Sequence, residues 1–156
     1  VINKRCQQPD FKHICNEGLI HRLPKVNHPV YYGGPILTNV VGVLHSTDYV
    51  LTSTNTLTED KVGFTLDRKM LEVIAKGQGP KNKLITLGLA NWTTGQLEEE
   101  LEHPRNPAMS WLIMDYDEKF VFGQLDDDKA DDLWENCVSQ AIRKKTKEIT
   151  GKIFKD

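Results

Sequence analysis

The residues of this chain that could perform chemistry are few and widely spaced. Glu100 and His103 form one Glu-x-x-His pair, a motif that occurs twice in di-iron helix bundles, together with two further glutamates. One pair supplies too few ligands for a stable metal site, so exposed helix charges are the better interpretation. The other histidines lack the spacing of metal ligands: His13, His21, His28 and His45. We therefore predict no metal site.

Nucleophilic side chains are present without partners that would activate them. His45 and Ser46 are neighbours, but consecutive residues of a strand point to opposite faces, and no Gly-x-Ser-x-Gly sequence surrounds the serine. Cys137 lies in an apolar helical stripe, where it serves as a small hydrophobic residue. No sequence feature near Cys6 or Cys15 activates a thiol, so a redox role has little support. These features favour a protein that is not an enzyme.

Two turns that combine glycine or asparagine with aromatic residues are the better candidates for a site. Gly33, Gly34 and Pro35 end a β-prone run, which indicates a turn that needs a positive φ or a close backbone approach. Asn91 and Trp92 form the second turn. If the turns meet, their polar and aromatic side chains converge as in a small-ligand site. The predicted ligand-binding residues are Tyr32, Gly33, Gly34, Asn91, Trp92, Gln96 and Glu98.

Neither glycine-containing stretch matches a nucleotide-binding motif. Gly33-Gly34-Pro35 lacks the Lys and Ser/Thr of a phosphate loop, and Gly77-x-Gly79 is not a dinucleotide fingerprint. The helix start at Thr93 offers free amides that could bind an anion. However, Thr93 and Gln96 stand at the spacing of a capping box, and three glutamates follow, so structural capping is preferred. No cofactor is predicted.

The elements that must position these side chains follow from periodicity and caps. Lys83 to Ala90 is a short apolar run, typical of a strand buried on both faces. The Thr93 to Gln96 capping box predicts that a helix starts there, with Leu97 and Leu101 on its inner face and Pro104 at its end.

The rest of the chain predicts more strands than helices. We expect a strand end at 1–4, strands at 29–35, 40–45, 49–52, 62–66, 110–114 and 119–122, and a polar connection at 55–61. The strands at 40–45 and 49–52 should form a hairpin. Helices are expected near 11–19, from the Asp67 cap to Lys76 with Gly77 as its stop, and along the stripe from Ala130 to Ile142. The predicted fold class is α+β with a mixed, mainly antiparallel sheet and flanking helices.

Composition restricts the class of protein. The chain has 156 residues, suited to one domain, and no apolar run near the roughly 20 residues that span a bilayer, so we expect no membrane partner. Three cysteines without a C-x-x-C pair favour a reducing cytoplasm. The net charge of −2 does not favour polyanions. The only basic concentration comprises Arg143, Lys144, Lys145, Lys147 and Lys152.

Several blocks taken together resemble the AlgH/YqgE family of bacterial proteins, and they occur in the family's order. Ser110-Trp111-Leu112 is similar to that family's Ala-Trp-Leu step, and Leu133-Trp134 falls where its terminal helix carries a similar aromatic residue. The main blocks are Val1 to Lys4, Pro29 to Pro35, Val43 to His45, Arg68 to Glu72 and Ala90 to Glu100.

The resemblance implies a single domain over 1–156, with an α+β fold whose sheet is bifurcated or partly barrel-like. It also implies a label of transcriptional regulator without an established biochemical function. Arg5 stands where the family usually has proline, and His103 to Met109 resembles an insertion. Because the family's first strands are expected to be missing before Val1, an exposed sheet edge favours homo-oligomers.

Our leading hypothesis is a non-catalytic cytoplasmic regulatory or interaction protein whose partner is a protein or a small molecule. DNA binding, which the family label suggests, is an alternative that the acidic net charge does not favour. A small-ligand-binding protein or enzyme, with its site near the Gly33-Gly34-Pro35 and Asn91-Trp92 turns, is the second alternative.

Overall fold

A computed structural model describes the chain except residues 21, 104–110, 124–133, 144–145 and 147–156. The fold divides into two compact units, Val1–Ala90 and Asn91–Asp156. No helix among the described residues is both long and apolar enough to cross a membrane.

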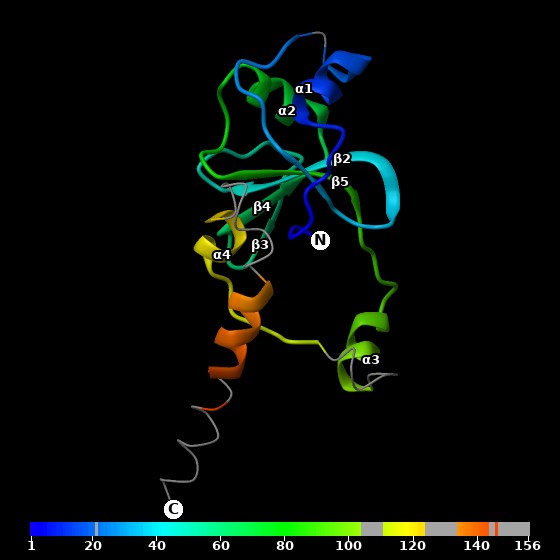
Figure 1. The fold of residues 1–156 in the computed structure, drawn as a ribbon, viewed down its shortest axis with the longest axis vertical. Coiled ribbons are helices and arrows are strands. Elements are labelled where there is room, and N and C mark those ends of the chain that lie inside the picture. Colours follow the sequence, from blue (N-terminus) through cyan, green and yellow to red (C-terminus); the bar gives the residue numbers. More distant parts are fainter. Residues whose placement is uncertain (21, 104–110, 124–133, 144–145, 147–156) are drawn as a thin grey trace, which may run out of the picture. The chain divides into compact units, whose positions relative to one another are not determined.

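The first unit is built on a five-stranded open sheet with the strand order β1-β5-β2-β4-β3 (Figure 1). β1 runs parallel to β5, and the other three pairings are antiparallel. This sheet confirms the predicted α+β class with mixed, mainly antiparallel pairing. The strands are β1 (Val30–Tyr32), β2 (Ile36–Ser46), β3 (Asn55–Leu57), β4 (Val62–Thr65) and β5 (Lys83–Leu89).

The beginning of the chain runs along the outer edge of β1. Arg5 forms an antiparallel bridge with Tyr31. The Cys6 N–H donates to the Val30 carbonyl at 2.8 Å, and the Tyr32 N–H donates to the Lys4 carbonyl at 2.7 Å. This edge of the sheet is therefore paired rather than open to another chain.

Helices cover one face of this sheet and supply much of its core (Figure 1). α1 (Phe11–Ile14) continues into a π-helical turn, η1 (Cys15–Leu19), in the region predicted to be helical. α2 (Arg68–Ala75) buries the predicted stripe of Met70, Leu71, Ile74 and Ala75. The buried cluster joins both helices to the sheet: it includes Phe11, Ile14, Met70, Ile74, Val43 and Ile85.

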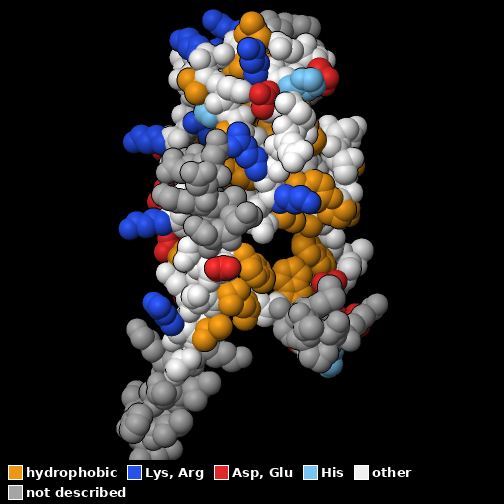
Figure 2. All heavy atoms as spheres, viewed as in Figure 1, with side chains coloured by type: hydrophobic (Ala, Val, Ile, Leu, Met, Phe, Trp, Pro, Cys, Tyr) orange, Lys and Arg blue, Asp and Glu red, His pale blue; other side chains and the backbone are white. Residues whose placement is uncertain are grey.

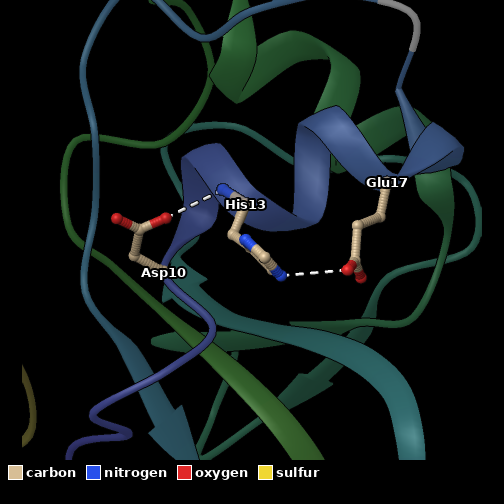
Figure 3. Close-up of polar contacts among 3 residues, drawn as sticks. All are labelled: Asp10, His13 and Glu17. Atoms are coloured by element: carbon tan, nitrogen blue, oxygen red, sulfur yellow. Dashed lines mark hydrogen bonds and ion pairs between the residues drawn. The ribbon is translucent and has the colours of Figure 1, made fainter.

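Side-chain caps define where both helices start. Asp10 Oδ1 accepts a hydrogen bond from the His13 N–H at 2.8 Å, and one turn later His13 Nε2 forms an exposed ion pair with Glu17 at 2.9 Å (Figure 3). Asp67 Oδ1 accepts from the Lys69 N–H at 2.9 Å, and Gly77 follows α2 with a φ of 74°. The predicted cap and stop of α2 are thus confirmed.

The predicted hairpin of 40–45 with 49–52 is wrong. Residues 49–52 form no strand, because a local turn uses their hydrogen bonds: the Leu51 N–H donates to Thr54 Oγ1 at 2.9 Å, and the Thr54 N–H donates to the Leu51 carbonyl at 3.0 Å. β2 pairs instead with β4 and β5. The stretch predicted as a polar connection contains the short edge strand β3.

The second unit contains α3 (Gln96–Glu102), α4 (Glu118–Phe122) and a helical stretch at 134–143. The strand predicted at 119–122 is wrong, because Asp117 caps α4 by accepting from the Lys119 N–H at 2.8 Å. Residues 111–114 are not a strand either, while Ser110 lies outside the described residues. The last helix is confirmed over 134–143; the earlier part of its stripe, from Ala130 to Leu133, also lies outside them.

Candidate functional site

The Gly33-Gly34-Pro35 turn carries the chain across the end of β5, from β1 on one side to β2 on the other. A Cβ on Gly33 would lie 2.1 Å from the Gly88 carbonyl oxygen, and one on Gly34 would lie 2.2 Å from the Leu89 carbonyl carbon. Gly88, which lies in β5, has a φ of 77° and faces the carbonyl of Gly34 in the turn. The predicted close backbone approach is confirmed. Because these glycines have no side chain, the chain can cross the end of β5 in direct backbone contact with it.

Side chains around this crossing are apolar and partly exposed. Tyr32 pairs with Leu87 at the end of β1, and Ile36 pairs with Leu89 at the start of β2. Between Ile36 and Val41 the register with β5 shifts, and Leu37 takes a φ of 51°. A positive φ is unfavourable for a residue other than glycine, so the backbone of the first unit carries strain beside the predicted site.

In the second unit, Glu100 connects two of the predicted site residues. The Trp92 Nε1–H donates to Glu100 Oε2 at 3.3 Å, and Gln96 Nε2 donates to Glu100 Oε1 at 3.3 Å. The Trp92 ring also meets the Trp111 ring edge-on, with centroids 5.8 Å apart. Glu100 and Trp111 were not among the predicted site residues. The four-residue spacing of Gln96 and Glu100 is a signal that could have found the first of them.

The capping box predicted at Thr93 is only half formed. The Gln96 side-chain oxygen accepts from the Thr93 N–H at 3.1 Å, but the Thr93 hydroxyl donates to that same oxygen at 3.2 Å instead of accepting from a helix amide. The residue before α3 is Gly95, with a φ of 80°. The helix therefore begins at Gln96, and the prediction that Thr93 is its cap is wrong. α3 contains no buried residue, so Leu97 and Leu101 do not form the predicted inner face.

The predicted site residues thus fall into two groups. Tyr32, Gly33 and Gly34 meet β5 within the first unit, whereas Trp92 and Gln96 meet at Glu100 within the second. Asn91 and Glu98 are exposed. A site that joins the two groups stays a prediction.

His45 and Ser46 turn out to have separate structural roles. His45 is 0% exposed, with Nδ1 2.9 Å from the Ser46 carbonyl oxygen and Nε2 2.9 Å from Thr65 Oγ1. The Ser46 hydroxyl donates to Asp48 and accepts from the Asn82 N–H at 3.1 Å. A histidine sealed from solvent cannot serve as a base for a substrate, so this pair does not act as a nucleophile and its base.

Among the described residues, the fold brings together no group of side chains suited to bind a metal or to activate a thiol. Across the described part of the chain, no group of three His, Cys, Asp or Glu side chains could hold a metal ion. Cys6, Cys15 and Cys137 are free thiols. Burial raises the pKa of each, which keeps the thiol rather than the thiolate form at neutral pH.

Comparison with known proteins decides the family. A model of the family described as AlgH-like matches residues 1–145. The chain belongs to the AlgH-like family. A UPF0301 protein of a Bradyrhizobium species is 41% identical over 139 residues, which cover 84% of this AlgH-like chain and 62% of that protein. A UPF0301 protein of Cereibacter sphaeroides is 36% identical over 129 residues, with 82% and 66% covered.

A solved structure shows the same fold. The solution structure of the AlgH protein from Pseudomonas aeruginosa matches with a TM-score of 0.66 at 24% identity, covering 91% of this chain and 70% of that one. This AlgH-like chain spans 62% of the length of the Bradyrhizobium relative.

Proposed function

We propose that this AlgH-like chain is a cytoplasmic, non-catalytic interaction module of a bacterial regulatory protein, and that it acts by binding another protein. The family itself has no established biochemical function. We further propose that both units belong to one AlgH-like domain, a proposal supported by the match of the family model across 1–145. The free cysteines support a reducing compartment.

The observation that carries this proposal is an exposed aromatic and aliphatic surface in the second unit. Trp111, Leu112 and Ile113 are consecutive, and their exposed fractions are 47%, 47% and 77%. Trp111 is held in place by its edge-on contact with Trp92, which Glu100 orients. Large apolar side chains that stay exposed are typical of protein interfaces, and tryptophan is enriched among residues that dominate binding energy.

The test places a photoreactive amino acid at Ile113 of the full-length protein in its bacterial host, with the exposed Glu99 as the control position. A protein crosslinked at Ile113 but not at Glu99 is then purified and titrated with the chain. We expect W111A to weaken this binding by at least tenfold, as for a central interface residue, while the exposed control variant E99A leaves it unchanged.

Two outcomes would defeat the proposal. One is equal crosslinking at both positions, or binding that W111A does not weaken. The other is turnover of a substrate that is lost when a residue near Trp92 is changed without loss of the fold.

The alternative of a small-ligand site or enzyme keeps one supporting observation, because Trp92 and Gln96 do converge on Glu100. An aromatic face beside an amide and a carboxylate is the kind of polar and apolar set that binds small molecules. In a W111F/W134F variant Trp92 is the remaining tryptophan of this chain, and quenching of its fluorescence by an added small molecule would favour this alternative over protein binding.

A further inference from the structure

A hollow of about 280 Å³ lies in the first unit, apart from the predicted site. It is formed by the chain that leaves α2, by the segment before β1 and by the start of β5. His28, Lys81 and Lys83 line it together with Gly77, Gly79 and Ile74, and no acidic residue among the described residues lines it. Figure 2 shows several Lys and Arg side chains at the end of this unit that carries α1 and α2.

Lys83 is a half-buried cation without a carboxylate partner. Its ammonium donates to the Pro80 carbonyl at 2.8 Å and to the Lys81 carbonyl at 3.4 Å. Lys83 forms no salt bridge with a described carboxylate. Burial lowers its pKa, and this effect is larger than the opposite effect of the Asp48 charge. A lysine ammonium has three donors, so one is left for a ligand. Burial of an unpaired charge is costly, and an anion in the hollow would offset that cost.

His28 is the second group with unused polar capacity. Its ring is half-buried and lies 5.8 Å from the Phe11 ring, centroid to centroid, but neither ring nitrogen bonds to a described residue. Burial first, and then the charge of Lys83, lower the pKa of His28. His28 and Lys83 both line the hollow, so a ligand in it can meet a cationic ammonium and a neutral imidazole.

The carboxylate and carbonyl groups near the hollow already accept hydrogen bonds from the protein. Asp48 accepts hydrogen bonds from the Ser46 hydroxyl and from the Lys81 N–H at 3.2 and 3.3 Å. The last carbonyls of α2 accept from nearby amides: Gly77 N–H bonds to Ile74, Gln78 N–H to Val73, and Lys25 N–H to Ala75. These carbonyls therefore present little unpaired negative charge to a ligand.

The glycines of the turn keep the hollow open. Gly77 and Gly79 have φ values of 74° and 91°, which side-chain-bearing residues rarely adopt. A Cβ on Gly79 would meet the Val73 side chain at 3.2 Å. At these two glycines, the hollow is therefore lined by backbone without side chains.

We propose that this hollow binds the phosphate group of a small, soluble phosphorylated molecule, with the Lys83 ammonium and the His28 imidazole on its oxygens. The proposal is independent of the protein interface proposed above. Phosphate fits better than a carboxylate because its larger set of oxygens can accept from the Lys83 ammonium and from an N–H of the neutral His28 imidazole at the same time. The volume lies below the usual 300–1,000 Å³ of drug-sized pockets, which favours a phosphate with a short substituent over an extended nucleic acid.

The test titrates the isotopically labelled full chain with inorganic phosphate at pH 6.5 and constant ionic strength, and follows amide and His28 ring resonances by NMR. We expect saturable shifts at Gly77, Gly79 and His28, with a Kd on the order of 1 mM. K83M, which keeps the apolar stem but removes the charge, should weaken binding at least tenfold. K61M is the matched control, because Lys61 is an exposed lysine paired with Glu59 on the same unit.

A second variant, H28Q, keeps the test decisive if K83M does not fold, and it should weaken binding several-fold. Glycerol phosphate and vesicles containing phosphatidic acid separate a soluble ligand from a lipid headgroup. Binding of the vesicles alone would overturn the proposal of a soluble ligand. Equal shifts with chloride, or equal affinity of K83M, H28Q and K61M, would overturn the site altogether.

Discussion

At the scale of single residues, His45 shows how a buried polar side chain is fully paired. Its Nδ1 lies against a carbonyl oxygen, which can only accept, so this nitrogen carries the proton. In the neutral ring, Nε2 then accepts from the Thr65 hydroxyl, which in turn accepts from the Thr54 hydroxyl at 2.8 Å. The Leu51 N–H donates to Thr54 Oγ1 and begins the series. Every hydrogen bond runs in the same direction, from the loop toward the end of β2.

Replacing His45 by leucine should therefore destabilise the fold. H45L would remove the acceptor of the Thr65 hydroxyl and the donor to the Ser46 carbonyl, and we expect a loss of about 2–4 kcal/mol in the free energy of unfolding. Urea denaturation of the full chain measures this loss. H13Q, at an exposed position of α1, should stay within about 0.5 kcal/mol of the wild type. A change as small for H45L would show that the series of hydrogen bonds does not stabilise the protein.

His28 should make stability depend on pH. Burial holds its folded-state pKa below the ordinary value of 6.5, so between these two pKa values the unfolded chain binds more protons than the folded one. Stability should then fall as the pH is lowered through 6.5 toward the folded pKa, with a slope of at most about 1.4 kcal/mol per pH unit. Unfolding curves between pH 7.5 and 5.5 should show a shallower slope for H28Q. An unchanged slope would contradict this.

Part of the candidate site was accessible from sequence. Two adjacent glycines before a proline predicted the close backbone approach at Gly33 and Gly34, because only a missing side chain permits it. The contact of Trp92 with Glu100 could not be predicted, since it depends on where the chain before α3 turns back. Glu100 is one of three consecutive glutamates, and its four-residue spacing from Gln96 is the local signal that distinguishes it from the other two.

At the scale of elements, prediction succeeded where local signals decide the structure. The Asp67 cap, the apolar stripe and Gly77 predicted α2. The apolar run from Lys83 to Ala90 predicted β5, in which the consecutive residues Leu84 to Thr86 are buried. Prediction failed where a distant partner decides, as for β2, which pairs with β4 and β5 rather than with 49–52. At α4, the Asp117 cap outweighs the β-propensity of Phe120 to Phe122.

The crossing of β5 gives the strongest prediction for an element. G33A would place a methyl group 2.1 Å from the Gly88 carbonyl oxygen, so β1 and β5 would have to separate. We expect a loss of about 3 kcal/mol or more in the free energy of unfolding. G123A is the matched control, because a Cβ there meets no atom of the described residues within 4 Å. Calorimetric unfolding of both variants gives the comparison, and equal stability of the two would show that the crossing relaxes without cost.

At the scale of the whole molecule, charge separates the candidate functions. The net charge is −2, and 22 acidic residues outnumber 20 Lys and Arg. Such a balance gives no general attraction to a polyanion. Any attraction of an anion must then be local, as proposed for the Lys83 ammonium and the His28 imidazole, where neighbouring groups rather than the total charge set the potential. One phosphate group is within reach of such a pair, whereas a duplex requires many phosphate contacts.

We therefore expect no specific binding of duplex DNA by the full chain. Labelled duplexes titrated at two salt concentrations should show at most the weak association typical of non-specific contacts, with a Kd of roughly 10⁻⁴ to 10⁻⁶ M or weaker. A K144Q/K145Q variant, which reduces the only basic concentration in the sequence, should behave like the wild type. Phosphate contacts release counterions, so they weaken steeply as the salt concentration rises. Tighter binding with this salt dependence that is also lost in the K144Q/K145Q variant would contradict the prediction and assign DNA contact to these lysines.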